Sequence, residues 1–138
     1  MDIINHPLFA QLSPFISNII VLHYLYWLDK TKCQCALTSL KHKLQIGFII
    51  LCVGSIIQIY AQSMNYNHFV KSFGLVYMTC SLYLSVYVIK YVHQLQQDDC
   101  NCSINWKRPY IYFVNVVELV LFIGSILYVI FDSLKKNL

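Results

Sequence analysis

The chain carries the same pattern twice, and this duplication limits the folds that are open to it. Residues 33–37, Cys-Gln-Cys-Ala-Leu, return 67 residues later as residues 100–104, Cys-Asn-Cys-Ser-Ile. Further matches at this spacing are Tyr24 with Tyr91, Leu28 with Leu95, and Lys41 with Arg108. Residues 51–57 return as residues 121–127 at a spacing of 70. Each copy joins two hydrophobic segments by a short basic Cys-X-Cys loop, which predicts two copies of one helical hairpin.

The composition indicates that this hairpin lies in a membrane. Hydrophobic residues make up 58% of the chain and charged residues 12%, with a mean hydropathy of +0.56. A soluble domain has about a quarter of its residues charged, so charges this sparse cannot solvate a globule. The 10 Lys and Arg residues are spread among loops and form no run, which argues against a nucleic-acid partner.

Four hydrophobic segments approach or reach the length of about 20 residues that a transmembrane helix needs. They are approximately residues 14–29, 44–62, 69–92 and 110–131. Ser13 fits the N-cap of the first segment and Pro14 its first helical position, and residues 8–12 are apolar enough to extend it. We therefore predict an all-α fold, a four-span transmembrane helical bundle made of two repeated helical hairpins, residues 1–67 and 68–138.

The basic residues also predict how the bundle is oriented. Seven lie on the side of the Cys-X-Cys loops and three on the side of the termini, namely Lys71, Lys135 and Lys136. Because Lys and Arg accumulate in cytoplasmic loops, the Cys-X-Cys loops are expected in the cytoplasm. The 11 tyrosines and the two tryptophans are expected to act mainly as anchors at the level of the lipid headgroups.

The four loop cysteines are the strongest candidates for chemistry. A disulfide from Cys33 or Cys35 to Cys100 or Cys102 would staple the hairpins together, although cytosolic redox conditions oppose it. Four thiolates could instead bind one tetrahedral zinc ion, but zinc sites usually place two to four residues between paired ligands. Free thiols, lipidated or packed, are the third alternative. Cys52 and Cys80, which lie inside spans, are expected to be small core residues.

Glu118 is the other residue that needs an explanation. An ionisable side chain near the middle of a span costs roughly 2.5–3.5 kcal/mol on insertion scales, so it must face protein or be protonated. Asn115 shares its helical stripe, and Gln58 lies on a similar polar stripe in the second hydrophobic segment. We expect Glu118 to make a structural contact with Gln58, a tyrosine or a neighbouring protein. A proton or ion pathway is the alternative.

Small residues predict how two of the spans meet. Gly54-Ser55 and Gly124-Ser125 occupy equivalent places in the two hairpins. Small and polar residues let transmembrane helices approach closely and form hydrogen bonds, so the second and fourth spans are expected to contact each other.

No enzyme motif is present in the sequence. It has no Ser nucleophile elbow, no His-Glu-X-X-His, no glycine-rich phosphate loop and no Cys-X-X-Cys pair. We therefore predict a protein that is not an enzyme and that uses no cofactor and no small-molecule substrate.

The two loops and their flanks resemble a known class of proteins. The pattern is an aromatic-rich span that ends in a Leu-rich turn, then Cys-X-Cys-Ala/Ser, a few polar residues and a Lys/Arg pair, and residues 28–36 and 100–111 are the segments that carry it. In this they resemble the small multi-pass membrane proteins of nucleocytoplasmic large DNA viruses. The second copy fits better, because the first has Ser39 where the second has Trp106 and His42 where it has Pro109.

The resemblance implies a structural role in a virion. The protein would belong to the internal virion membrane, or would be a minor capsid protein that links this membrane to the capsid shell. Its partners would be the lipid bilayer and other capsid or membrane proteins. The loops would lie on the cytoplasmic, capsid-facing side, with Lys107 and Arg108 as partner contacts. Such viruses carry a cytoplasmic thiol-oxidation system, which would permit disulfides there. The alternative function is a small channel or transporter of the viroporin kind.

Overall fold

The structure, a computed structural model, describes residues 7–137, including the side chains of residues 12–128 and 130–135. Within these residues it contains helices and turns and no strand, so the all-α prediction is confirmed. The four long helices are α1 (Pro7–Lys30), α2 (Ser39–Ser63), α3 (Asn67–Gln97) and α4 (Lys107–Asn137). Two short 3-10 turns, η2 (Gln34–Ala36) and η3 (Asn101–Ser103), lie in the Cys-X-Cys loops.

The helices are longer than the hydrophobic segments from which they were predicted. The predicted start at Pro14 with Ser13 as the N-cap is wrong, because α1 begins at Pro7 and Pro14 lies inside it, whereas the extension through residues 8–12 is part of the helix. A proline suits the first turn of a helix, where its missing N–H would have no partner in any case. The start of α2 is fixed by Thr38, whose Oγ1 accepts a hydrogen bond of 3.3 Å from the backbone N–H of Lys41.

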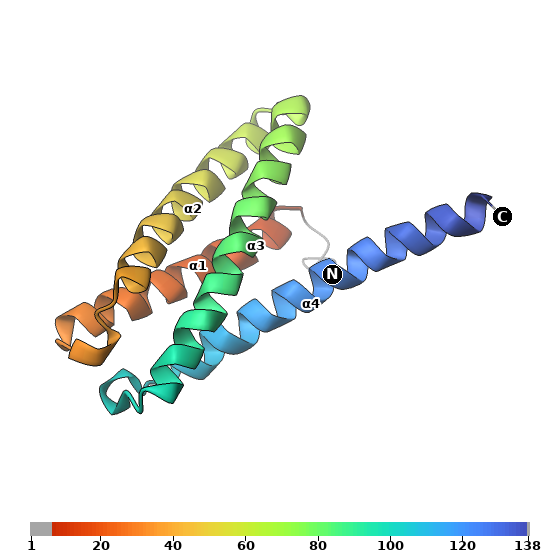
Figure 1. The fold of residues 1–138 in the computed structure, drawn as a ribbon. Helices are drawn as coiled ribbons and strands as arrows, with labels where there is room; N and C mark the ends of the chain where they lie inside the picture. The colour runs from red at the N-terminus through yellow and green to blue at the C-terminus, as the bar shows by residue number, and fades with distance from the viewer. Residues whose placement is uncertain (1–6, 138) are drawn as a thin grey trace, which may run out of the picture.

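The helices pack in a ring of four neighbours. The extensive contacts are α1 with α2, α2 with α3, α3 with α4, and α1 with α4. Figure 1 shows both Cys-X-Cys loops at one end of the molecule and the turn between α2 and α3 at the other. The C-terminal half of α4 extends away from the other helices. The molecule is therefore tightly packed near the loops and open toward the opposite end.

The core lies beside the loops and uses equivalent positions of α1 and α3. Its fully buried members in α1 are Val21, Tyr24, Leu25 and Leu28, and those in α3 are Val88, Tyr91, Val92 and Leu95. Each residue of the first set has its counterpart in the second at the repeat spacing of 67. The two copies of the pattern thus supply matching parts of one core.

Much of the apolar surface of the helices faces outward. Among the described residues, three helical segments are long and apolar enough to cross a membrane: α2, α3, and residues 107–135 of α4. Large side chains along them are exposed, including Ile50, Leu75 and Leu121. This is the surface expected of an integral membrane protein, because lipid tails replace water around it. Whether α1 also crosses the bilayer remains a prediction.

The predicted contact between the second and fourth spans through their glycines is wrong. Gly54 faces α3, where an added Cβ atom would lie 3.3 Å from the ring of Tyr77. An added Cβ at Gly124 would meet no atom within 4 Å. The reason is that Gly54 is turned toward α3, whereas Gly124 of α4 lies in open space.

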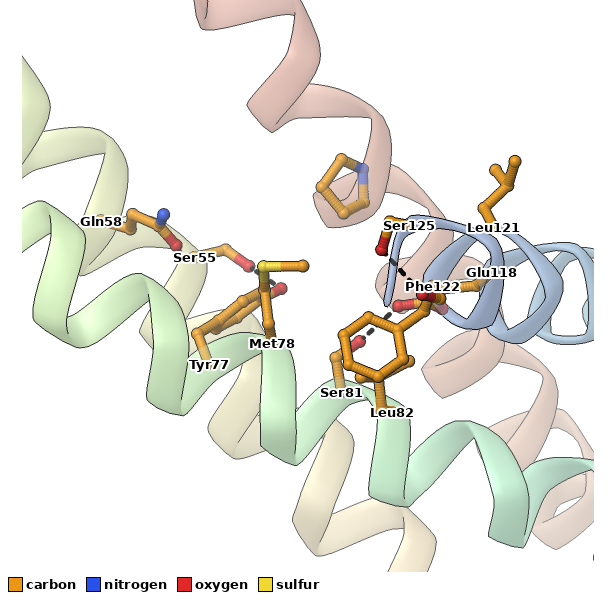
Figure 2. A pocket seen from close by; sticks show the side chains of 11 residues that line it. Ser55, Gln58, Tyr77, Met78, Ser81, Leu82, Glu118, Leu121, Phe122 and Ser125 are labelled. Atoms are coloured by element: carbon orange, nitrogen blue, oxygen red, sulfur yellow. Dashed lines mark hydrogen bonds between the residues drawn. The ribbon is translucent and has the colours of Figure 1, made fainter. Parts of the chain in front are cut away.

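A cavity of about 460 Å³ lies among the helices (Figure 2). All four helices line it, and its polar members are Ser55 and Gln58 of α2, Tyr77 and Ser81 of α3, and Glu118 and Ser125 of α4. Pro14 is the residue of α1 that lines it. Parts of the polar stripes predicted for α2 and α4, including Gln58 and Glu118, therefore face a shared cavity.

Candidate functional site

The two Cys-X-Cys loops have the same backbone conformation. In each, the residue before the first cysteine has a positive φ, 51° at Lys32 and 46° at Asp99. The N–H of Cys33 then bonds the carbonyl oxygen of the residue five positions back at 3.3 Å, and that of Cys100 does so at 3.1 Å. This is the Schellman ending of a helix, here formed without glycine. Both α1 and α3 therefore present their cysteines in the same way.

The cysteines are joined across the loops. Disulfides link Cys33 to Cys102 and Cys35 to Cys100, with Cα–Cα distances of 5.6 and 5.9 Å. Both distances lie in the normal range for a disulfide. Cys33 and Cys100 are buried, whereas Cys35 and Cys102 are exposed at the surface. Shifting either bond by the repeat spacing of 67 gives the other, so the two bonds are equivalent in the repeat.

Two buried tyrosines tie each half of the chain to the loop of the other half. The hydroxyl of Tyr24 donates to the carbonyl oxygen of Ser103 at 2.8 Å, and that of Tyr91 donates to the carbonyl oxygen of Ala36 at 2.7 Å. Both tyrosines are almost completely buried. For these two residues the predicted role of headgroup anchor is wrong, because their hydroxyls are used inside the protein. Their place in the repeat was the signal that could have shown this.

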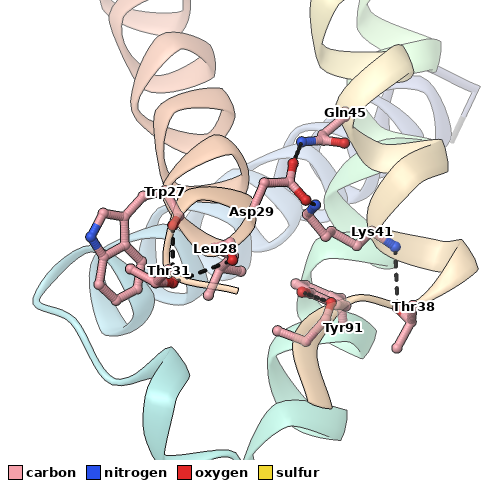
Figure 3. A network of polar contacts seen from close by, with 9 residues as sticks. Trp27, Leu28, Asp29, Thr31, Thr38, Lys41, Gln45 and Tyr91 are labelled. Atoms are coloured by element: carbon pink, nitrogen blue, oxygen red, sulfur yellow. Dashed lines mark hydrogen bonds and ion pairs between the residues drawn. The ribbon is translucent and has the colours of Figure 1, made fainter. Parts of the chain in front are cut away.

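A polar network beside the first loop joins α1 to α2 (Figure 3). Lys41, whose side chain is 5% exposed, forms an ion pair with Asp29. Gln45 donates from Nε2 to the other carboxylate oxygen of Asp29 at 2.7 Å. The buried ammonium is thus neutralised within the chain, a contact that the charge count along the sequence did not indicate.

Lys107 and Arg108, the predicted partner contacts, are half-buried and both contact their own chain. Lys107 Nζ lies 2.9 Å from Nδ1 of His23 and 5.5 Å from the centre of the Trp106 ring. Arg108 donates from its guanidinium to the hydroxyl oxygen of Ser103 at 3.0 Å. Arg108 therefore supports the second loop from within.

Glu118 is bound by hydroxyl groups of α3. Ser81 donates to one carboxylate oxygen at 2.8 Å and Ser85 to the other at 3.1 Å. Among the described side chains, the hydrogen bonds of Glu118 go to these serines and not to Gln58 or a tyrosine, although Gln58 and Tyr77 line the same cavity, and the predicted contact with a neighbouring protein stays a prediction. Ser81 and Ser85 were missed because the partner helix of Glu118 depends on packing rather than on periodicity.

Two further polar side chains, those of Asn115 and Tyr77, form hydrogen bonds inside the bundle. Asn115 is buried and donates from Nδ2 to the carbonyl oxygen of Ile111 in its own helix at 2.6 Å. The hydroxyl of Tyr77 lies 2.7 Å from Ser55 Oγ and accepts from Asn18 Nδ2 at 2.9 Å. Tyr77 thereby joins α1, α2 and α3, a role that the sequence patterns did not indicate.

The loop pair is also the place where a metal ion could bind. The Sγ atoms of Cys33, Cys35, Cys100 and Cys102 all lie within 4.8 Å of one another. As disulfides they cross-link the two halves of the chain, and as thiolates they form a potential four-sulfur ligand set.

Comparisons with protein-family models, with curated proteins and with solved structures found no match.

Proposed function

We propose that the chain is a structural, non-enzymatic membrane protein that uses its joined Cys-X-Cys loops as a contact surface for other proteins. The observation that carries this proposal is the pair of disulfides between the two loops. They connect residues 69 and 65 positions apart, and cross-links over loops of this length stabilise a fold by roughly 2–4 kcal/mol. A surface fixed in this way loses little conformational entropy when it binds a partner.

The side chains around the disulfides suit a protein contact. Leu37, Ile104 and Trp106 are 43%, 66% and 66% exposed at the loop end of the molecule. Tryptophan is enriched among the residues that dominate binding energy in protein interfaces. Apolar side chains next to basic ones also suit the boundary between the membrane and an adjoining protein layer.

The proposed arrangement in the membrane has four spans. α1 joins α2, α3 and α4 in crossing the bilayer, as two equivalent hairpins, residues 1–67 and 68–138. The matched loops, the matched disulfides and the reciprocal tyrosine bonds support this duplication. The excess of Lys and Arg on the loop side supports a cytoplasmic location for the loops.

In the setting that the viral resemblance implies, the membrane is the internal membrane of a virion and the partner belongs to the capsid shell. The test is a photoreactive amino acid placed at Trp106 in the full-length protein during infection. A specific adduct with one capsid or membrane protein in purified virions is expected. The matched control places the probe at Leu75, which is 70% exposed on α3 and is expected to react with lipid. Absence of the protein from virions, or identical adducts at both positions, would contradict the proposal.

The second candidate function is a small channel or transporter. The cavity of about 460 Å³ with Glu118 at its wall favours it, because polar groups inside a membrane often mark an ion or substrate path. Apart from its three serines, Gln58, Tyr77 and Glu118, the lining of the cavity consists of apolar residues, namely Pro14, Met78, Leu82, Leu121 and Phe122. We therefore rank this function second.

A further inference from the structure

The four loop sulfurs have most of the geometry of a zinc site. The four sulfurs form six pairs, of which four are not bonded. The distances between the sulfurs of these four pairs are 3.5, 3.6, 3.9 and 3.9 Å. Zinc–sulfur bonds of about 2.3 Å give a ZnS4 tetrahedron an edge of about 3.8 Å. The four unbonded separations lie within about 0.3 Å of this edge, whereas the two disulfide-bonded pairs are far shorter than it. After reduction, rotation of the side chains about their Cα–Cβ bonds can open these two pairs.

The spacing within each loop does not prevent a metal site. Only one residue separates the cysteines of each pair, yet the Sγ atoms of Cys33 and Cys35 lie 3.9 Å apart. The Sγ atoms of Cys100 and Cys102 lie at the same distance. The 3-10 turn that follows each helix end places both sulfurs of a loop on one side. The backbone that sets these positions is held by its own hydrogen bonds and by Tyr24 and Tyr91, not by the disulfides alone.

The charge around the cluster favours thiolates. Six Lys or Arg residues and three Asp residues lie in residues 29–43 and 98–108. Lys41 is paired with Asp29, but Lys32 directly precedes Cys33 and is exposed. A ZnS4 centre carries two negative charges, and neighbouring cations stabilise thiolates and the centre alike. Cys35 and Cys102 are exposed, so an ion can reach the cluster from solvent.

We propose that the reduced loops bind one zinc ion through Cys33, Cys35, Cys100 and Cys102, and that formation of the two disulfides releases it.

Two molecules of a dithiol supply four electrons and four protons, which convert the two disulfides into four thiols, and each dithiol becomes a disulfide. Zinc then displaces four thiol protons and forms four Zn–S bonds. In the reverse direction, two disulfide oxidants accept the four electrons and the zinc ion leaves. The junction between the halves is thereby kept in both redox states. This inference does not rest on the proposed function.

The test uses the full-length protein in detergent micelles. It is reduced with a phosphine, freed of reductant and metal, and titrated with Co²⁺ and then Zn²⁺. We expect one equivalent per chain, with the thiolate charge-transfer band and the visible bands of tetrahedral cobalt, and displacement of cobalt by zinc. The oxidised protein should bind none. Treating the zinc form with a disulfide oxidant should release one zinc ion for each two disulfides formed.

Two variants make the result specific. The double variant Cys35→Ser/Cys102→Ser removes the exposed cysteine of each loop and should lose the tetrahedral spectrum. It keeps Cys33 and Cys100, whose Sγ atoms lie 3.6 Å apart and can still cross-link the halves. The matched control Cys52→Ser/Cys80→Ser removes the two cysteines outside the loops and should bind one equivalent unchanged. Failure of the reduced wild-type protein to bind cobalt in tetrahedral form, or full binding by the loop variant, would overturn the inference.

Discussion

The hydroxyl of Tyr24 donates a hydrogen bond of 2.8 Å to the backbone carbonyl oxygen of Ser103, which lies in the other half of the chain. Shifting both residues by the repeat spacing leads to the equivalent bond, in which the tyrosine of the second half reaches the loop of the first. Each half thus completes the loop structure of the other. Because the two disulfides connect the same loops, the tyrosines and the cysteines form one junction.

The tyrosine bonds should contribute to stability equally in the two halves. Tyr24→Phe and Tyr91→Phe each remove the hydrogen bond from a buried hydroxyl to a buried carbonyl oxygen, at a cost of about 1 kcal/mol. Thermal unfolding of the protein in detergent should therefore show a similar loss for both variants. Tyr26→Phe, at an exposed position on α1, is the matched control and should change little. A control effect as large as the other two would contradict this account.

The network at Asp29 should hold the first loop against α2. Asp29→Ala leaves the buried Lys41 ammonium without its carboxylate and should destabilise the protein by about 1–3 kcal/mol. Denaturant unfolding measures this loss. Asp98→Ala changes an acidic residue at the equivalent helix end in the second half, where its side chain is exposed, and should have a small effect. Equal losses in the two variants would show that the ion pair has no special role.

The two glycines that were predicted to bring α2 and α4 together should respond differently to a larger side chain. Gly54→Leu places atoms against Tyr77 and Phe73 of α3 and should destabilise the helix pair, by roughly 1–3 kcal/mol for overpacking. Gly124→Leu meets open space and should be neutral or slightly stabilising, because leucine forms helix better than glycine. Thermal unfolding of the two variants compares them directly. The opposite order would mean that the α4 face is packed after all.

Glu118 separates the two candidate functions. Glu118→Gln keeps an amide oxygen that can accept from one of Ser81 and Ser85 and an amide nitrogen that can donate to the hydroxyl oxygen of the other, but it removes the titratable proton, so a structural protein should tolerate it. Flux of protons and small ions into proteoliposomes is the measurement, with Gln58→Glu as a second variant at the same cavity. We expect no flux above that of empty liposomes from any of these proteins. Flux through the wild type that Glu118→Gln abolishes would favour the channel.

The sequence predicts the helices and the placement of both loops at one end of the molecule. It predicts the pairing of the cysteines and the contacts between helices less well. Hydrophobic runs bounded by basic loops identify α2, α3 and α4, and the repeat predicts that the four loop cysteines lie at one end. The sequence does not predict which cysteine pairs with which, because Cys33 lies almost equally near Cys100 and Cys102 along the chain. The sequence also does not show that Gly54 and Glu118 face α3, because the rotation of each helix about its axis is set by packing among several helices.

The cross-loop disulfides are tested most directly by cutting the chain between its halves. Cyanogen bromide cleaves after methionine, and the chain has three, Met1, Met64 and Met78, of which Met64 lies in the turn between α2 and α3. The protein is purified without reductant, alkylated to block free thiols and then cleaved under denaturing conditions. Cys52→Ser/Cys80→Ser, cleaved in parallel, excludes a bond between the two cysteines outside the loops. We predict that residues 2–64 and 79–138 remain joined and separate only after reduction. Separation without reductant would mean that the loops are not joined to each other, and would contradict the account.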